Sequence, residues 1–189
     1  NSEGARFVQE ATVARLAQDS ATEADFREQF ATLTLGSGAA AMLLSRAELC
    51  PDGHRFVGVV NRAATQHNQL CRGQADRMTT DAKTLLFAGL ELAAETWQAA
   101  RQTLGWEAAQ LDEFVLHQVS GTHTHSLAQM LELDPAKILK IFPEFGNIGP
   151  ASVPIVLSKA AESGRLQRGM RVALMGIGSG LNCAMAEVV

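Results

Sequence analysis

Two rhythms of apolar and polar positions run along this chain and predict where its helices and strands lie. The clearest helical rhythm spans residues 81–104, with Gly105 at the position where helices commonly end. One face of this segment carries apolar and small residues and one threonine, namely Leu85, Gly89, Leu92, Thr96 and Ala100. Weaker spacing predicts a short helix at 7–16, and further helices are expected at 123–131 and 151–163.

Short apolar runs bounded by glycine, proline or polar residues predict strands. In the second part of the chain these runs are 55–60, 114–116, 171–175 and 181–189. A glycine-rich turn at 176–180 joins the last two. Together with the helices, the runs give the order β-α-β-α-β-β, which predicts a layered α/β fold for residues 54–189.

The first fifty residues give a less regular pattern. Residues 26–30 are interpreted as a connection. Residues 32–35 then alternate with a period of two, Gly36-Ser37-Gly38 follows, and 39–44 form a second apolar run. This pattern predicts a strand, a tight turn and a second strand.

Residues 34–42 resemble residues 176–185, because both read as strand, Gly-Ser-Gly, strand. The likeness is either chance or the trace of a duplicated fold. In a duplicated fold, residues 54–189 would be one complete half and 1–49 only the tail of the other, separated by the turn Cys50-Pro51-Asp52-Gly53. A tail cannot cover its side of a layered sandwich, so duplication requires a missing segment or a partner chain.

Composition excludes several classes of protein. Of 189 residues, 47% are apolar and 19% charged, and the net charge of −4 without a Lys/Arg block gives no reason to expect nucleic acid or an anionic membrane as a partner. No apolar run approaches the roughly 20 residues of a membrane span. Cys50, Cys71 and Cys183 are irregularly spaced and do not indicate a disulfide framework, so a reducing cytoplasm is expected. Residues 1–6 show neither a Met start nor a signal peptide, and we expect the chain to begin within a longer protein.

Candidate chemistry lies at the end of a predicted strand and in loops rich in glycine. His117 directly follows the apolar run FVL, and ligands of open α/β folds bind beyond strand ends. Asn147 lies in GNIGPASVP, a loop by its Gly and Pro content that leads into a helix. Gly178-Ser179-Gly180 would let the backbone approach a ligand closely. Taken one by one, each also fits an ordinary role: a hydrogen-bonded core histidine, a turn residue and a hairpin turn.

Three motifs together change this picture: VLHQVS, GNIGPASVP and GIGSGLNCAMAEVV. Over essentially the whole chain they resemble the C-terminal half of 3-ketoacyl-ACP synthase III and its relatives in the thiolase superfamily. The interval of thirty residues between His117 and Asn147 is the one that this family uses. Within the group, LCRGQ, DRM, HQVS and GNIGPASVPIVLSK most resemble the acyl-CoA:acyl-CoA condensing enzymes of bacterial long-chain-olefin and β-lactone biosynthesis.

The resemblance implies a thiolase-like fold and an active site shared with an absent N-terminal half. His117 and Asn147 match the second and third members of the family's Cys-His-Asn triad, and the nucleophilic cysteine would lie upstream of Asn1. The family's oxyanion hole takes one backbone N–H from the late glycine-rich turn, here Ser179, with Gly178 and Gly180 beside the substrate. The implied partners are fatty acyl-CoA substrates and the N-terminal half, in a homodimer of the whole, with no cofactor and no metal.

The implied reaction joins two fatty acyl-CoAs by a non-decarboxylating Claisen condensation into a 2-alkyl-3-ketoacyl product. Neutral donors on His117 and Asn147 would stabilise the enolate oxygen in a dry site. The family's base is a glutamate of the absent half that reaches across a dimer interface. One alternative is a decarboxylating synthase III that uses malonyl-ACP, and another is a non-catalytic subunit that shapes a partner's acyl channel.

Other polar groups are weaker candidates. His123 and His125 have no Cys, Asp or Glu at recognisable metal-ligand spacing, so we interpret them as part of a helix face or loop. Glu144 is the only local candidate for a base, and we interpret it as a solvated loop carboxylate. None of the three cysteines is expected to be the nucleophile, because free cysteines are usually small buried apolar residues.

Overall fold

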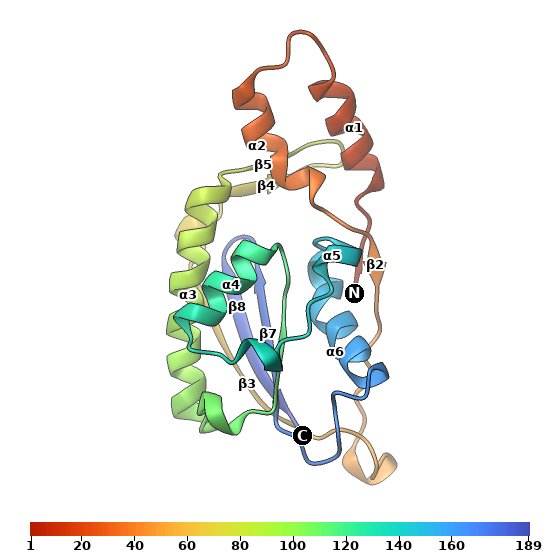
Figure 1. Ribbon diagram of the computed structural model, residues 1–189, viewed down its shortest axis with the longest axis vertical. Helices are drawn as coiled ribbons and strands as arrows, with labels where there is room; N and C mark the ends of the chain where they lie inside the picture. Colours follow the sequence, from red (N-terminus) through yellow and green to blue (C-terminus); the bar gives the residue numbers. More distant parts are fainter.

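The computed structural model describes residues 1–189, and its centre is a four-stranded mixed sheet with helices on both faces (Figure 1). In spatial order the strands are β3 (Phe56–Ala63), β8 (Asn182–Val188), β7 (Val172–Gly178) and β6 (Glu113–Leu116). β6 and β7 are parallel, whereas β8 is antiparallel to both of its neighbours. The parallel pair needs a crossover, which the helix α6 (Ser152–Glu162) provides.

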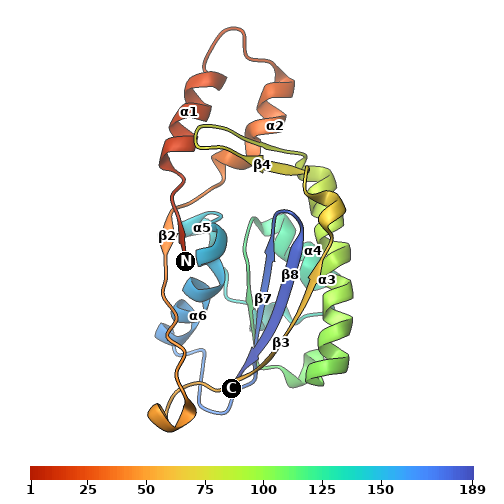
Figure 2. The ribbon, with the colours of Figure 1, turned by 180° about the vertical axis from the view of Figure 1, so that it is seen from behind.

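Helices cover the two faces of the sheet unequally (Figure 2). α3 (Ala82–Leu104) and α4 (Gly121–Met130) close a core of 22 buried residues on one face, and α6 covers a smaller core of seven on the other. α3 begins where the side chain of Asp81 accepts a hydrogen bond from the N–H of Thr84, and it ends at Gly105, whose φ of 66° is left-handed.

Two buried carboxylates stabilise the sheet from inside. Glu187 on β8 is 2% exposed, and its carboxylate binds the guanidinium of Arg171 through two contacts of 2.7 and 3.0 Å. The indole N–H of the fully buried Trp106 donates to the same carboxylate at 2.7 Å. Glu113 on β6 is paired with Arg165 in the same way. These carboxylates can be buried because each is paired and hydrogen-bonded.

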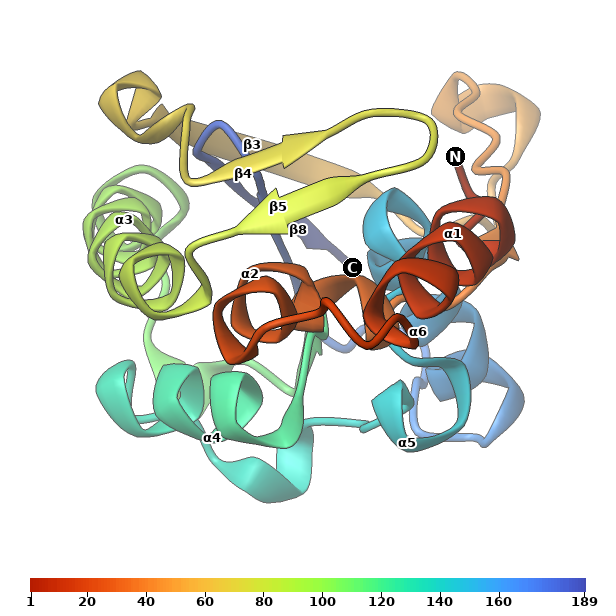
Figure 3. The same cartoon turned by 90° about the horizontal axis from the view of Figure 1, so that it is seen from above.

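The N-terminal segment lies over one end of the sheet, together with a hairpin from the middle of the chain (Figures 1 and 3). Its elements are β1 (Ser2–Glu3), α1 (Arg6–Leu16), α2 (Glu23–Leu33) and β2 (Gly38–Ala39), and the hairpin consists of β4 (Cys71–Gly73) and β5 (Met78–Thr80). The segment pairs its own β1 with β2, and α2 packs on β5.

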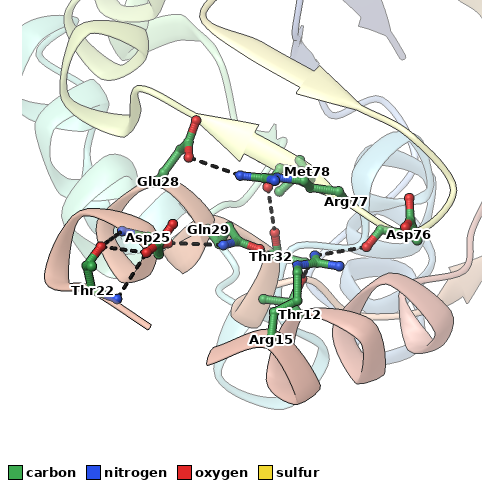
Figure 4. Close-up of polar contacts among 10 residues, drawn as sticks. All are labelled: Thr12, Arg15, Thr22, Asp25, Glu28, Gln29, Thr32, Asp76, Arg77 and Met78. Atoms are coloured by element: carbon green, nitrogen blue, oxygen red, sulfur yellow. Dashed lines mark hydrogen bonds and ion pairs between the residues drawn. The ribbon is translucent and has the colours of Figure 1, made fainter. Parts of the chain in front are cut away.

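Polar contacts hold the two N-terminal helices to this hairpin (Figure 4). Arg15 of α1 donates to the side-chain oxygen of Gln29 at 3.0 Å and to the carbonyl of Asp76 at 2.9 Å. The hydroxyl of Thr32 donates to the carbonyl of Met78 at 3.4 Å. The helices are therefore joined to the hairpin by hydrogen bonds more than by a shared apolar core.

The remaining elements are short. α5 (Phe142–Phe145) is a single turn that precedes α6. Short 3-10 turns occur at Ala47–Leu49, Thr65–His67, Ala108–Gln110, Pro135–Lys137 and Gly149–Ala151. No helix of the structure is both long and apolar enough to cross a membrane.

The predicted β-α-β-α-β-β order is confirmed, whereas the N-terminal predictions need correction. The expected connection at 26–30 is the middle of α2, which begins with a capping box between Thr22 and Asp25. The expected strand, turn and strand at 32–44 is wrong, because Thr32 and Leu33 belong to α2 and β2 is only two residues long. The two Gly-Ser-Gly stretches therefore do not form matching hairpins.

Candidate active site

His117 is held at the end of the parallel strand pair. It follows β6 directly, and its backbone N–H donates to the carbonyl of Met175 on β7 at 2.8 Å. Burial and, to a smaller extent, the neighbouring His123 together lower the pKa of His117 to about 4, while the backbone of Gly149 acts in the opposite direction. The imidazole is therefore neutral at pH 7 and can offer an N–H as a donor.

Asn147 is fixed by backbone pairing with a distant segment. Its N–H donates to the carbonyl of Thr34 at 2.9 Å, and its carbonyl accepts from the N–H of Gly36 at 2.8 Å. The result is a single parallel bridge between Leu35 and Asn147. The side-chain oxygen of Asn147 accepts from the N–H of Gly149 at 3.1 Å, which orients the amide so that its NH2 group can donate to a ligand.

Two glycines make this close pairing possible. A Cβ on Gly36 would overlap the carbonyl oxygen of Phe145. Gly146 ends α5 with a φ of 67°, and a Cβ there would lie 2.9 Å from the carbonyl oxygen of Thr34. Only residues without a side chain let the two segments approach so closely.

The late glycine-rich turn is the hairpin between β7 and β8. The prediction placed it at 176–180, but β7 continues to Gly178 and the turn itself comprises residues 179–181. Ser179 is exposed, and Gly180 has a φ of 112° that favours glycine.

One cavity of roughly 730 Å³ brings most of the expected site residues together. His117, Asn147, Gly178 and Ser179 line it, whereas Gly180 does not. Its apolar wall includes Phe30, Leu35, Met78, Leu85, Leu86, Val119, Val153, Ile177 and Leu181. The cavity thus offers neutral donors beside an apolar surface, which is the usual character of a small-molecule site.

A second imidazole, which the sequence analysis interpreted as part of a helix face or loop, also lines this cavity. His123 on α4 has a buried Nδ1 without a hydrogen-bond partner, and burial lowers the pKa of its side chain. His117 and His123 also share a smaller void beneath the cavity. The position of His123 within the helix α4 could have indicated this, because that position determines whether the side chain faces the strand ends.

The remaining candidates are Glu144 and the three cysteines, and of these only Cys71 lines the cavity. Glu144 is exposed on α5 and does not line the cavity. Cys50 is exposed, and Cys183 is buried in β8, where burial raises the pKa of its thiol. Cys71 lines the cavity, with its sulfur 3.5 Å from the hydroxyl of Thr80. No three His, Cys, Asp or Glu side chains come together as a metal site.

Comparison with known proteins agrees with this geometry. Residues 102–188, which contain both His117 and Asn147, match the family described as 3-oxoacyl-[acyl-carrier-protein (ACP)] synthase III C terminal. This part of the chain is therefore similar to the C-terminal domain of the synthase III family. The fold that the sequence predicted, a thiolase-like α/β architecture, is thereby confirmed.

Several relatives within this thiolase superfamily cover nearly the whole chain. The acyl-CoA:acyl-CoA alkyltransferase of Xanthomonas campestris is 56% identical over 99% of this chain and 55% of the relative. That of Shewanella oneidensis is 34% identical over 98% of the chain and 56% of the relative. A β-ketoacyl-ACP synthase III of Streptomyces coelicolor is 30% identical over 83% and 48%. The chain therefore spans about half the length of the curated relatives that it matches.

Solved structures match as well. OleA of Xanthomonas campestris, with a cysteine replaced by alanine, superposes with a TM-score of 0.97 at 56% identity and covers 100% of this chain and 55% of that one. OleA with bound lauric acid and lauroyl-CoA, in a cysteine-to-serine variant, matches with the same TM-score and covers 56% of that chain.

Proposed function

We propose that this chain is the C-terminal half of an acyltransferase that joins two fatty acyl-CoAs by a non-decarboxylating Claisen condensation. The observation that carries this proposal is the single cavity in which His117, Asn147 and Ser179 meet an apolar wall. The 56% identity to an acyl-CoA:acyl-CoA alkyltransferase supports it. Residues 1–49 would be the tail of the N-terminal half, and 54–189 the complete C-terminal half.

In this reaction one acyl group is held as a thioester on a cysteine of the N-terminal half, and a base of that half takes an α-proton from a second thioester. The resulting enolate carries its charge mostly on the thioester oxygen. Its carbon attacks the carbonyl carbon of the held acyl group, and the cysteine leaves as a thiolate. The neutral imidazole N–H of His117 and the amide NH2 of Asn147 would donate to that oxygen, because both are preorganised and neither carries a charge that must be neutralised. A protonated imidazole is not needed, which agrees with the low pKa of His117.

The acyl-transfer step uses a different donor. The backbone N–H of Ser179, at the tip of the β7–β8 hairpin, would stabilise the oxyanion formed at the first thioester, together with an N–H from the nucleophile's own loop. Gly178 and Gly180 on either side leave the backbone accessible to the substrate. The side chain of Ser179 has no chemical role in this scheme.

The whole protein would be a dimer of two-half protomers in the cytoplasm, acting in long-chain-olefin biosynthesis. In support, nine large apolar residues within the first 49 are exposed, and Leu43 and Leu44 reach 96% and 79%. So many exposed apolar side chains in one short segment suggest a protein–protein contact. All three cysteines are unpaired, which suits a reducing compartment.

The alternative is a decarboxylating synthase III, favoured by the likeness to the Streptomyces coelicolor protein at 30% identity. A non-catalytic subunit is less favoured, since it would not need His117, Asn147 and the Ser179 turn in one cavity. The deciding experiment supplies the whole enzyme with lauroyl-CoA, with and without labelled malonyl-ACP. We expect a 2-alkyl-3-ketoacyl product from lauroyl-CoA alone, whereas release of labelled carbon dioxide coupled to product would favour the decarboxylating reaction.

A further inference from the structure

Gln118 is a buried polar residue that the proposed reaction does not use. It directly follows His117 and is 0% exposed. A buried amide is unfavourable unless its polar atoms are hydrogen-bonded, so the groups that it contacts explain why it is tolerated.

The side chain of Gln118 binds the segment that leads to Asn147. Its Oε1 accepts hydrogen bonds from the N–H groups of Ile141 at 2.8 Å and Phe142 at 3.2 Å. These groups begin α5, which has no capping side chain of its own. Its Nε2 donates to the carbonyl of Leu139 at 2.6 Å.

The backbone of Gln118 binds the segment that follows Asn147. Its N–H donates to the hydroxyl oxygen of Ser152 at 3.0 Å. Ser152 is 1% exposed and is the first residue of α6. The loop that carries Asn147 is therefore attached at both ends to the residue beside His117.

Hydrogen bonds within α5 connect the groups that Gln118 binds to the residues just before Asn147. The N–H of Phe145 donates to the carbonyl of Ile141, and that of Gly146 donates to the carbonyl of Phe142. A single helical turn thus connects the groups that Gln118 holds to Asn147. A shift of Ile141 or Phe142 would move the Asn147 amide relative to the His117 imidazole.

We propose that Gln118 is a positioning residue that fixes the spacing between the His117 imidazole and the Asn147 amide. This role rests on the proposed condensation, in which both groups donate to one enolate oxygen. Gln118 touches no substrate in this scheme, because the oxygen and nitrogen of its side chain are bound to the backbone of segment 139–142.

The test compares Gln118→Leu with Gln118→Glu in the whole enzyme. Leucine removes all three side-chain hydrogen bonds, and misplacement of reacting groups by about 1 Å can cost about 100-fold in rate. We expect ketone formation to fall about 10- to 100-fold through kcat, with little change in KM and with the burst of CoA release largely retained. Glutamate keeps the acceptor for Ile141 and Phe142 and, when burial holds it protonated, can still donate to the carbonyl of Leu139, so it should recover part of the lost rate.

Gln29 offers a matched control, since it is also a buried glutamine, at 2% exposed. It accepts from Arg15 and donates to the carbonyl of Asp25, far along the chain from the paired donors, and it does not line the cavity (Figure 4). Gln29→Leu should lower the free energy of unfolding without changing kcat. If both leucine variants lose kcat and stability in the same proportion, Gln118 has only a structural role and the proposal is wrong.

An independent readout separates this inference from the proposed function. NMR titration of the His117 ring reports its surroundings whether or not ketone is formed. We expect Gln118→Leu to move the pKa of His117 upward, because a loosened wall admits water, while Gln29→Leu leaves it unchanged. Absence of ketone with the unsubstituted enzyme would reject the proposed function, whereas an unchanged titration in Gln118→Leu would reject the role of Gln118.

Discussion

The two parts of this molecule are stabilised in opposite ways. Residues 54–189 enclose two apolar cores around one sheet, and their buried carboxylates are all paired. Residues 1–49 bury only four side chains, of which three are polar: Ala5, Thr12, Gln29 and Thr32. Most of their large apolar side chains face outward. The second part can therefore hold catalytic geometry rigidly, whereas the first gains its structure from what it contacts.

The buried ion pair at Glu187 is expected to give the largest effect on stability. Replacing Glu187 with alanine leaves the Trp106 indole N–H without an acceptor and the Arg171 guanidinium without its carboxylate, and breaking a buried pair in this way costs about 3–5 kcal/mol. Chemical denaturation measures the loss. The control is Glu23→Ala in α2, which removes an exposed pair with Arg27 and should cost only about 0.3–0.5 kcal/mol. Equal losses would contradict the contrast between the two parts.

Loss of the Asn147 amide is expected to be the next largest effect. Asn147→Ala removes one preorganised donor from the enolate oxygen, which typically costs about 2.7–4 kcal/mol, or about 10² to 10³ in rate. Ketone formation should fall by that factor while acyl loading, seen as the burst of CoA release, survives. His117→Ala should do the same or worse. Glu23→Ala, the exposed control used above, should leave both steps unchanged. If Asn147→Ala reduced the burst of CoA release and the steady-state formation of ketone equally, the assignment of Asn147 to the second thioester would be wrong.

Acid should act on the sheet part before it acts on the N-terminal part. The pKa of His117 lies near 4 in the folded protein and near 6.5 when unfolded, so the unfolded state binds the proton first as pH falls. Between pH 6.5 and 4.5 this removes about 2 to 3 kcal/mol of stability, and the lowered pKa of His123 acts in the same direction.

The N-terminal part responds in a lower pH range. Hydrogen bonds from Thr22 lower the pKa of Asp25, so its contribution to stability is present above the ordinary value of 3.8 and is lost only below it.

The variant His117→Phe tests the acid sensitivity of the sheet part. Its free energy of unfolding should differ less between pH 7 and pH 4.5 than that of the unsubstituted protein. An unchanged difference would mean that another group causes the acid sensitivity.

The smallest expected effect concerns the outer apolar face. Leu44 is 79% exposed, and we expect the N-terminal half or a second protomer to cover it. Leu44→Asp should weaken that association by about 2 kcal/mol if Leu44 is a central contact, and should hardly change the stability of the chain measured separately. Analytical ultracentrifugation of the mixed components measures this. The proposed assembly would be contradicted if the unsubstituted 189 residues formed a stable, well-folded monomer that did not associate with the N-terminal half or with a second protomer.

The sheet part could be predicted because its sequence periods are long and clear. α3 shows six turns of one apolar face, and β7 and β8 are apolar runs separated by glycines. α2 was missed although Phe26, Phe30 and Leu33 stand at the i, i+4, i+7 spacing of one helix face. The capping box of Thr22 and Asp25 was a second available signal. β4 and β5 were missed because three-residue strands are too short to show alternation.

The residue types of the candidate site could be predicted from the sequence, whereas the residues that hold them in place could not. His117 and Asn147 could be singled out because their motifs are distinctive, and the structure places both on one cavity, while their catalytic roles stay a prediction. Gln118 and Ser152 could not, since a sequence does not show which backbone groups a buried side chain meets. The same holds for Cys71, which the sequence places in a polar stretch and the structure places on the cavity wall.

The bridge between Leu35 and Asn147 joins positions more than a hundred residues apart. The polypeptide between them makes this contact intramolecular, so it raises the effective concentration of one segment near the other. A cut in the exposed turn at 51–53 would turn the bridge into a contact between two molecules. Ordering of the Asn147 loop would then depend on protein concentration. The affinity between the two fragments would measure how strongly the N-terminal segment stabilises this loop.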